Sequence, residues 1–291
     1  MQSPLRYPGS KQLLVDYLDS TLKENLLVGL SFVEAYAGGA SLSLGLLARG
    51  TITRATLVEK DPLLYAFWKV ASRRPRDLAR CIRGIEISIQ EWQHQRRYLD
   101  PNALRKYDLL DLATACMFLN RTSFSGILGA GPIGGLKQSS KYSLSCRFNR
   151  ERLASAVEAI EPFGCKLSVV HSDAIRYLKA RSSSLCEQGS VVYLDPPYFQ
   201  QGKKLYRYHY DLKDHQAVAS FICKQPYPWI VSYDDHPTIH EMFAGQKIVP
   251  ISLNYVIKQS RKVDELIIAN IKLVPPRYEM VVPRKGRAVA I

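Results

Sequence analysis

The stretch Val191-Val192-Tyr193-Leu194-Asp195-Pro196-Pro197-Tyr198-Phe199 joins an apolar run to one acid, two prolines and two aromatic residues. The run 191–194 is short and has no polar break, which predicts a buried parallel strand. The prolines end this strand because they lack the N–H group that a ladder needs, and Pro197 favours an extended backbone at Pro196. Asp195 is therefore expected at the carboxyl edge of a sheet, where open α/β sheets bind their ligands.

The turn after this strand brings two hydrogen-bond acceptors and an aromatic ring together. The Asp195 carboxylate and the Pro196 carbonyl can jointly hold an exocyclic NH₂ group, while Tyr198 stacks on the flat ring that carries it. Asp and Pro are also common turn residues, so an ordinary strand-to-turn connection with a helix-capping acid is the alternative for this tetrapeptide taken alone.

Two other predicted strands end in residues that suit a nucleotide-like ligand. An apolar strand that begins at Ser31 breaks at Gly38-Gly39 and resumes as an apolar helix, and glycines at such a break let the backbone approach a ligand closely. The strand 55–59 ends in Glu59, about 20 residues after the glycines, where an acid can accept hydrogen bonds from ribose hydroxyls. A dinucleotide-binding fold is the competing interpretation, but the Gly-x-Gly-x-x-Gly spacing is missing.

Three further segments allow both a structural and a binding role. Asp61 precedes Pro62 and can cap a helix that starts there. A third strand from Leu167 ends near Asp173, which suits a ligand site or a helix N-cap equally well. Near the start, Arg6-Tyr7-Pro8-Gly9-Ser10-Lys11 combines an aromatic residue, a turn and a lysine that opens a helix. That combination makes an anion site, although a capped helix with solvated basic residues explains it at least as well.

Taken in order, these motifs resemble those of the Dam-like, D12-class DNA adenine methyltransferases, over most of the chain. Residues 195–198 resemble that family's Asp-Pro-Pro-Tyr motif, residues 31–41 its methyl-donor loop and residues 6–11 its first element. Ala35 and Ala40 depart from the pattern, since they stand where proline and glycine are usual. The resemblance implies an α/β fold, namely a Rossmann-like S-adenosylmethionine-dependent methyltransferase sheet of seven strands with a reversed last strand and an inserted, mainly helical target-recognition domain.

The resemblance also implies roles for individual residues. It places S-adenosyl-L-methionine, the methyl donor, against Tyr7, Lys11, Glu34, Gly38, Gly39, Glu59, Asp173 and Asp195. It assigns the reaction to Asp195, Pro196, Pro197 and Tyr198. The acid and the Pro196 carbonyl would accept hydrogen bonds from N6 of an adenine flipped out of duplex DNA, and Tyr198 would stack on that base. Positioning and electrostatics suffice for this chemistry, so no metal ion is expected.

The same resemblance divides the chain into two domains. Residues 1–72 and 166–291 are the expected methyltransferase domain, and residues 73–165 are the expected target-recognition insertion. Helical apolar spacing between Pro75 and Asn120 supports helices in the insertion. The Gly-rich tip 129–135 is predicted as the turn of a β-hairpin that enters a DNA groove.

Within the insertion, residues 118–126 resemble the family's Asn-Arg-x-x-aromatic-x-Gly hallmark. The residues expected at the DNA are Arg121, Phe124, Ser125, Lys137, Lys141 and Arg147. The resemblance makes Phe124 a wedge in the base stack, and the basic residues are expected at phosphates. A plain core position is the alternative for Phe124.

Composition agrees with a polyanionic partner. The 291 residues carry a net charge of +14, which attracts phosphate backbones in a salt-sensitive way. No apolar segment is long enough to span a bilayer and nothing resembles a signal peptide, so a cytoplasmic location is expected. The six cysteines are scattered without a Cys-x-x-Cys pair, which is atypical of a zinc site.

Several other functions share some of these features. Methylation of cytosine N4 uses the same turn, but the motif order and the insertion favour adenine. An RNA adenine methyltransferase would share the chemistry. A nucleic-acid-binding subunit of a defence complex, impaired in catalysis, is the alternative from another class; Ala35 and Ala40 favour it, and the intact Asp195 argues against it. A cognate nuclease or another defence protein is a possible partner beside double-stranded DNA.

Overall fold

The computed structural model describes residues 1–6, 11–200, 210–257 and 259–276, and only the backbone of residues 252–257 and 259–264. The expected cofactor residue Tyr7 lies outside the described residues. Within the described ranges, every helix is too short or too polar to cross a lipid bilayer.

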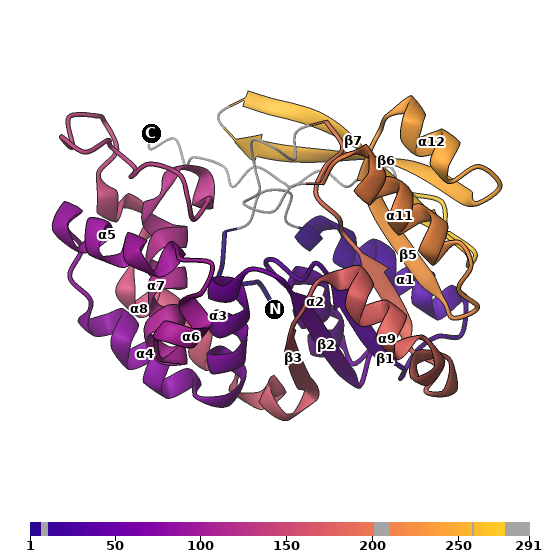
Figure 1. Cartoon of the computed structure of the whole chain (residues 1–291), viewed down its shortest axis with the longest axis horizontal. Coiled ribbons are helices and arrows are strands. Elements are labelled where there is room, and N and C mark those ends of the chain that lie inside the picture. Colours follow the sequence, from indigo (N-terminus) through magenta and orange to yellow (C-terminus); the bar gives the residue numbers. More distant parts are fainter. Residues whose placement is uncertain (7–10, 201–209, 258, 277–291) are drawn as a thin grey trace, which may run out of the picture.

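A seven-stranded sheet with the order β3-β2-β1-β4-β5-β7-β6 forms one half of the molecule (Figure 1). The strands are β1 Ser31–Ala35, β2 Arg54–Glu59, β3 Leu167–His171, β4 Val191–Leu194, β5 Trp229–Asp234, β6 Lys247–Ile257 and β7 Gln259–Ala269. The pairs from β3 to β5 are parallel, and β7 runs antiparallel between β5 and β6. The predicted Rossmann-like α/β sheet with one reversed strand is confirmed.

The last two strands are longer than their apolar residues indicate. The sequence predicts strands at 247–253 and 265–269, whereas β6 continues to Ile257 and β7 begins at Gln259. The charged residues Arg261, Lys262 and Asp264 interrupt the apolar pattern, yet their backbones pair across the β6–β7 ladder.

Successive side chains of a strand point to opposite faces of the sheet. Val191 and Tyr193 belong to the hydrophobic cluster that also contains residues of α1 and α2, while Val192 and Leu194 belong to a second cluster with α9, α11 and α12. The helices on these faces are α1 Val15–Glu24, α2 Ser41–Arg49, α9 Ala174–Glu187, α11 Leu212–Ile222 and α12 Pro237–Met242. All four residues of β4 are buried, as predicted.

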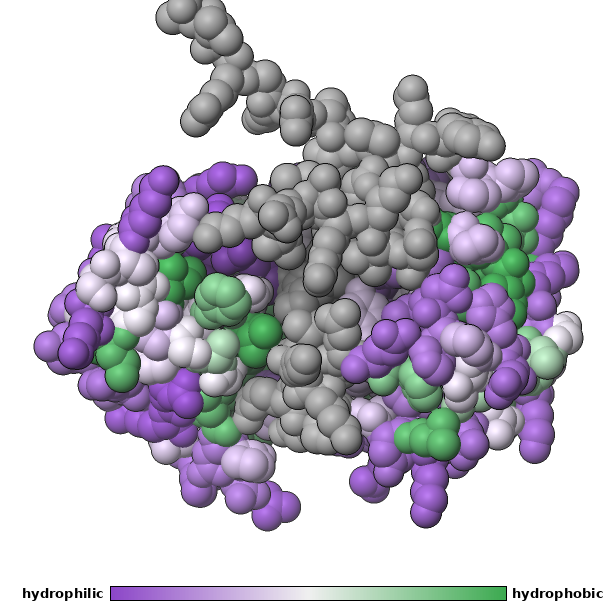
Figure 2. Space-filling view, turned by 90° about the horizontal axis from the view of Figure 1, so that it is seen from above, coloured by the Kyte–Doolittle hydropathy of each residue, from purple (hydrophilic) through white to green (hydrophobic). Residues whose placement is uncertain are grey.

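The other half of the molecule is helical and lies on the left in Figure 1. Its helices are α4 Pro75–Gly84, α5 Ile89–Gln95, α6 Ala103–Lys106, α7 Leu109–Thr122 and α8 Arg150–Glu158. In the view from above, hydrophilic residues cover the outer rims of both halves and hydrophobic side chains form separate patches (Figure 2).

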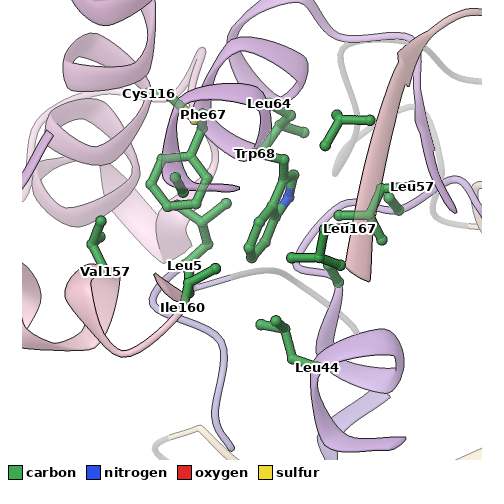
Figure 3. Packing of buried hydrophobic residues seen from close by; sticks show 14 of the residues in the cluster. Leu5, Leu44, Leu57, Leu64, Phe67, Trp68, Cys116, Val157, Ile160 and Leu167 are labelled. Carbon is green, nitrogen blue, oxygen red and sulfur yellow. The ribbon is translucent and has the colours of Figure 1, made fainter. Parts of the chain in front are cut away.

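Helix α3, Pro62–Arg73, carries one continuous core from the sheet into the helical half. Figure 3 shows Phe67 beside Cys116 of α7, and Trp68 beside Leu57 of β2 and Leu167 of β3. Phe67 and Trp68 meet edge to face with ring centroids 5.0 Å apart, and neither is exposed. The insertion therefore shares its core with the sheet.

The Gly-rich segment after α7 does not form the predicted β-hairpin. Residues 127–143 form turns, with one isolated bridge between Ser123 and Pro132. Glycines with positive φ, such as Gly134 at 87° and Gly135 at 75°, and a proline without a donor cannot sustain a ladder. Instead, the Gln138 side chain holds the segment: its Nε2 donates to the carbonyls of Ile133 and Gly135, and its Oε1 accepts from Leu144 N.

Candidate active site

The order in which the chain adds strands to the sheet changes direction between β1 and β4. Strands β2 and β3 lie on one side of β1, and β5 lies on the far side of β4, so the carboxyl ends of β1 and β4 flank the switch point of the sheet. Ala35 pairs with Leu194 at this edge, and Asp195 follows directly. Glu59 ends β2, and Asp173 lies two residues beyond β3. The strand-end acids predicted from the sequence thus share one edge.

Asp195 is held from two directions. Its Oδ1 accepts a hydrogen bond from Ser232 Oγ of β5 at 2.8 Å and lies 3.0 Å from the Lys11 ammonium. Burial raises the pKa of Asp195, the Lys11 charge lowers it, and the negative charge of Glu265 raises it. The side chain keeps 19% of its surface exposed, so a ligand can still reach it.

The turn 195–200 is fastened to the neighbouring strand. The two carboxylate oxygens of Asp234, the last residue of β5, accept from the backbone N–H groups of Phe199 at 2.8 Å and Gln200 at 2.9 Å. The Tyr193 hydroxyl lies 2.7 Å from Ser232 Oγ, which fixes the serine that holds Asp195. Asp195 therefore sits in a preorganised position.

Glu265 of β7 completes this site and was not predicted from the sequence. Its side chain is fully buried, and its Oε1 accepts from the Tyr198 hydroxyl at 2.8 Å and from the Lys11 ammonium at 3.3 Å. The Lys11 nitrogen also lies 5.1 Å from the centre of the Tyr198 ring. The resemblance assigned Lys11 to the cofactor, whereas the structure places its ammonium between two carboxylates. The one sequence feature that pointed to Glu265 is that this acid directly precedes the apolar run 266–269.

Glu34 faces into the protein, toward the start of α2. Its Oε2 accepts from Ser43 N at 2.9 Å, and burial raises the pKa of Glu34 to about 7. The cap residue of α2 is Ala40, whose φ is 46° and whose side chain offers no acceptor, so Glu34 supplies the missing cap from β1. The structure thus gives this predicted cofactor residue a structural contact.

Glu59 and Gly38 are bonded to each other at the same edge. Glu59 Oε2 accepts from Gly38 N at 2.9 Å and its Oε1 accepts from Asp61 N at 2.8 Å, while burial raises the pKa of Glu59 to about 7. The Gly38 carbonyl accepts from Trp68 Nε1 at 2.8 Å. Asp61 caps α3 through Leu63 N, which confirms the structural alternative for that acid.

Asp173 takes the helix-capping role considered for it, and its second carboxylate oxygen contacts two side chains. Its Oδ1 caps α9 by accepting from Ile175 N and Arg176 N. Its Oδ2 lies 3.3 Å from the Lys60 ammonium and accepts from the Tyr210 hydroxyl at 3.4 Å. Tyr210 in turn meets Tyr36 edge to face, with their hydroxyls 3.0 Å apart. Aromatic rings and a carboxylate therefore lie together beyond β3.

The hallmark segment of the insertion is tied to the N-terminal segment. Asn120 Nδ2 donates to the carbonyls of Arg6 and Gly126, and Asn120 Oδ1 accepts from Arg6 N at 2.7 Å. A Cβ on Gly126 would lie 2.6 Å from the Arg6 carbonyl oxygen, so this position requires glycine. Phe124 has 67% of its surface exposed, which excludes the core alternative.

Arginines from both segments surround a cavity of about 420 Å³. Its charged lining residues are Arg6, Arg121, Arg147 and Arg152, and none of the described residues that line it is acidic. Arg121 donates to the Pro4 carbonyl, and its buried Nε has no hydrogen-bond partner among the residues that the structure describes. Burial, together with the other arginines, lowers the pKa of Arg121 to about 10. Of the other residues expected at DNA, Lys137, Lys141 and Arg147 are exposed and Ser125 is half-buried.

Comparison with known proteins gives one extensive match. The family model of the D12 class N6 adenine-specific DNA methyltransferases matches residues 7–257. No curated protein has a sequence that matches the chain. A candidate RNA methyltransferase from Pyrococcus horikoshii is 12% identical over 93% of this chain and 87% of that chain, with a TM-score of 0.36. A precorrin-6y C5,15-methyltransferase from Geobacter metallireducens is 12% identical over 94% of this chain and 100% of that chain, with a TM-score of 0.37.

Proposed function

Because the chain belongs to the D12 class of N6 adenine-specific DNA methyltransferases, we propose that it transfers a methyl group to N6 of an adenine turned out of duplex DNA. S-adenosyl-L-methionine is the methyl donor of this class. Turning the base out is required because an amine inside a base pair cannot reach the donor.

The position of Asp195 carries this proposal. The carboxylate lies at the switch point, partly exposed and held by Ser232 and Lys11. Among the described residues, no donor is bonded to the Pro196 carbonyl, which leaves a second acceptor beside the first. Tyr198 follows in the same fastened turn. The two acceptors match the two hydrogens of an adenine amine, and the ring matches the face of the base.

The chemistry needs an electrophilic carbon and a nitrogen with an oriented lone pair. Bound S-adenosyl-L-methionine supplies a methyl group on a positively charged sulfur. Asp195 and the Pro196 carbonyl hold the two N–H groups, so the lone pair of N6 points away from them. As the C–N bond forms, the C–S bond breaks and its electron pair stays on sulfur. N6 then carries the positive charge beside Asp195 and releases one proton, which this carboxylate can accept.

Methyl incorporation tests the proposal directly. The purified protein should transfer label from S-adenosyl-L-methionine to duplex DNA, and nucleoside analysis should find N6-methyladenine. Label in structured RNA alone, or N4-methylcytosine as the product, would contradict the proposed substrate.

The residues at the strand ends fit the donor. Both oxygens of Glu59 already accept backbone N–H groups, yet each carboxylate oxygen can accept a second hydrogen bond, as a ribose hydroxyl requires. Asp173 offers a carboxylate beside the Tyr36–Tyr210 pair, which suits an adenine ring with its amine. We assign Glu59, Asp173 and the loop at Gly38-Gly39 to the donor, and Lys11 to the reacting end of the site.

The arginine-lined cavity supports DNA as the partner. Four positive side chains without an acid repel one another, and a phosphate group would relieve that repulsion. We therefore propose that residues 73–165, together with the N-terminal segment, bind the DNA backbone, and that Arg121, Arg147 and Arg152 contact phosphates there.

The double substitution Arg147→Ala/Arg152→Ala is expected to weaken DNA binding about 10- to 100-fold for every sequence. It should also reduce the slope of log affinity against log salt by about 2, one for each lost phosphate contact. Fluorescence anisotropy at several salt concentrations measures both. The control Arg54→Ala/Arg181→Ala removes the same charge from two exposed positions. Arg54 is the first residue of β2, at the end of the strand away from Glu59, and Arg181 lies in α9. Equal losses in both variants would contradict a specific phosphate site.

The exposed Phe124 ring gives a second prediction for DNA. Phe124→Ala should lower kcat/KM on paired duplex about 10-fold or more, since stacking on a base contributes about 1–3 kcal/mol. The loss should shrink when the target adenine is mismatched, because that base is already partly unstacked. Leu26→Ala removes a side chain that is 90% exposed and serves as the control. An equal loss on paired and mismatched DNA would argue against a wedge.

A further inference from the structure

Lys11, Asp195 and Glu265 form a buried cluster of three charged groups. Lys11 has 4% of its surface exposed and its nitrogen lies 3.0 Å from Asp195 Oδ1 and 3.3 Å from Glu265 Oε1. The two carboxylates therefore share one ammonium, so neither has the Lys11 charge to itself. A carboxylate that shares its ammonium attracts a further positive charge more strongly than one that has an ammonium to itself.

We propose that Glu265 is a positioning residue of the methyl transfer, which shares the Lys11 ammonium so that Asp195 keeps unneutralised negative charge and which fixes the Tyr198 ring beside it. This inference rests on the proposed function, because the positive charge that Asp195 would stabilise is the one that passes from sulfur to N6 with the methyl group. Without Glu265, the Lys11 ammonium would neutralise Asp195 more fully, and the carboxylate would stabilise that positive charge less well.

The geometry explains why Glu265 can have both effects. Its Oε1 accepts from the Tyr198 hydroxyl at 2.8 Å, so the carboxylate sets the position of the ring that follows Asp195 and the two prolines. Its strand, β7, pairs directly with β5, which supplies Ser232 and Asp234 to the same turn. Glu265 itself pairs with Asp234 in the register of these strands.

Glu265 and Lys11 act on the ionisation of Asp195 with opposite signs. The Glu265 charge raises the pKa of Asp195 and the Lys11 charge lowers it. Glu34 on β1 also interacts electrostatically with Asp195 and itself has a pKa of about 7. Burial and the Asp195 charge both raise the pKa of the Tyr193 hydroxyl and that of the Tyr233 hydroxyl.

The pH profile of kcat/KM separates this role from a structural one. Activity requires ionised Asp195, so kcat/KM falls as the pH falls through its pKa. Glu265→Gln removes a negative charge and should move this acid limb to lower pH, with kcat on the plateau reduced about 10- to 100-fold, as when partners that orient an active-site ligand are removed. Lys11→Met should move the limb to higher pH, and the double variant should lie between the two.

Matched variants assign each part of the effect. Tyr198→Phe removes the hydroxyl bond to Glu265 without changing charge, so it should lower kcat without moving the limb. Glu34→Gln shows whether any part of the acid limb of the pH profile comes from the titration of Glu34. Glu187→Gln is the control, because it changes an exposed glutamate at the end of α9 and should leave the profile unchanged. If Glu265→Gln fails to fold, the opposite shift of Lys11→Met and the unshifted Tyr198→Phe profile still test the charge assignment.

The outcomes distinguish this inference from the proposed function. A wild-type protein that methylates DNA, with a Glu265→Gln variant equal to it in rate and profile, would overturn the role of Glu265 alone. So would Glu265→Gln and Lys11→Met shifts of the same sign. A wild-type protein that methylates no adenine would instead overturn the proposed function.

Discussion

Replacement of Asp195 by Asn is expected to lower kcat by about 10³-fold or more while leaving the fold intact. Asparagine keeps an oxygen that can accept from Ser232, so the 2.8 Å contact that positions the side chain survives. The negative charge is lost, and with it the acceptor that stabilises positive charge on N6 during the transfer. Removal of one preorganised group that faces developing charge typically costs about 10²–10³ in rate, and here the proton acceptor is lost as well.

Single-turnover methylation of a duplex, together with far-UV circular dichroism, checks this prediction. DNA binding should change little, because the phosphate contacts proposed for the arginine cavity are elsewhere. Asp16→Asn, at a carboxylate with 79% of its side chain exposed, is the charge-matched control and should retain full activity. Turnover by Asp195→Asn within tenfold of the wild type would remove the carboxylate from the mechanism.

The part of this site that depends on local sequence was predictable. An apolar run followed by Asp195 and two prolines determines where a strand ends and what its end presents, and the chain order of the acids places them at one edge of a parallel sheet. The burial of residues 191–194 agrees with that expectation, whereas the reversed strand β7 was implied by the family resemblance and by no local pattern. Proline and glycine act on their own backbone, so their effects can be read without knowing the tertiary contacts.

Contacts between distant segments were not predictable in the same way. Glu265 reaches Tyr198 only because β7 inserts between β5 and β6, and this register cannot be derived from the residues around Glu265. Glu34 stands in a motif associated with the donor, yet its carboxylate caps α2 because Ala40 offers no acceptor. Arg152 lines the cavity beside Arg121 through the packing of α8, which no motif indicated.

The predicted hairpin shows how composition can mislead. The glycines at 129–135 predicted the turn of a hairpin, but Gln138 binds the turn backbone with its own side chain and has a φ of 48°. A side chain that supplies the hydrogen bonds of a ladder removes the need for the second strand. The Gly-rich composition therefore marked a loop and not the tip of a hairpin.

Trp68→Ala is expected to reduce the free energy of unfolding by about 3–5 kcal/mol, the usual cost of deleting a large buried aromatic side chain. Trp68 is fully buried at the junction where α3 joins the sheet to the helical half, and its Nε1 holds the Gly38 carbonyl at 2.8 Å. The loss should therefore affect both halves at once. Urea unfolding followed by far-UV circular dichroism should give one transition, displaced to lower urea, for the variant and the wild type alike.

Trp68→Phe separates packing from the hydrogen bond. Phenylalanine keeps most of the buried ring but leaves the Gly38 carbonyl without its donor, which should cost about 1–3 kcal/mol. The phenylalanine variant should also bind S-adenosyl-L-methionine more weakly in calorimetry, because the loop assigned to the donor loses one of its two anchors while Glu59 retains the other. Two separate unfolding transitions in Trp68→Ala, one for each half, would show that the insertion folds independently of the sheet despite their continuous core.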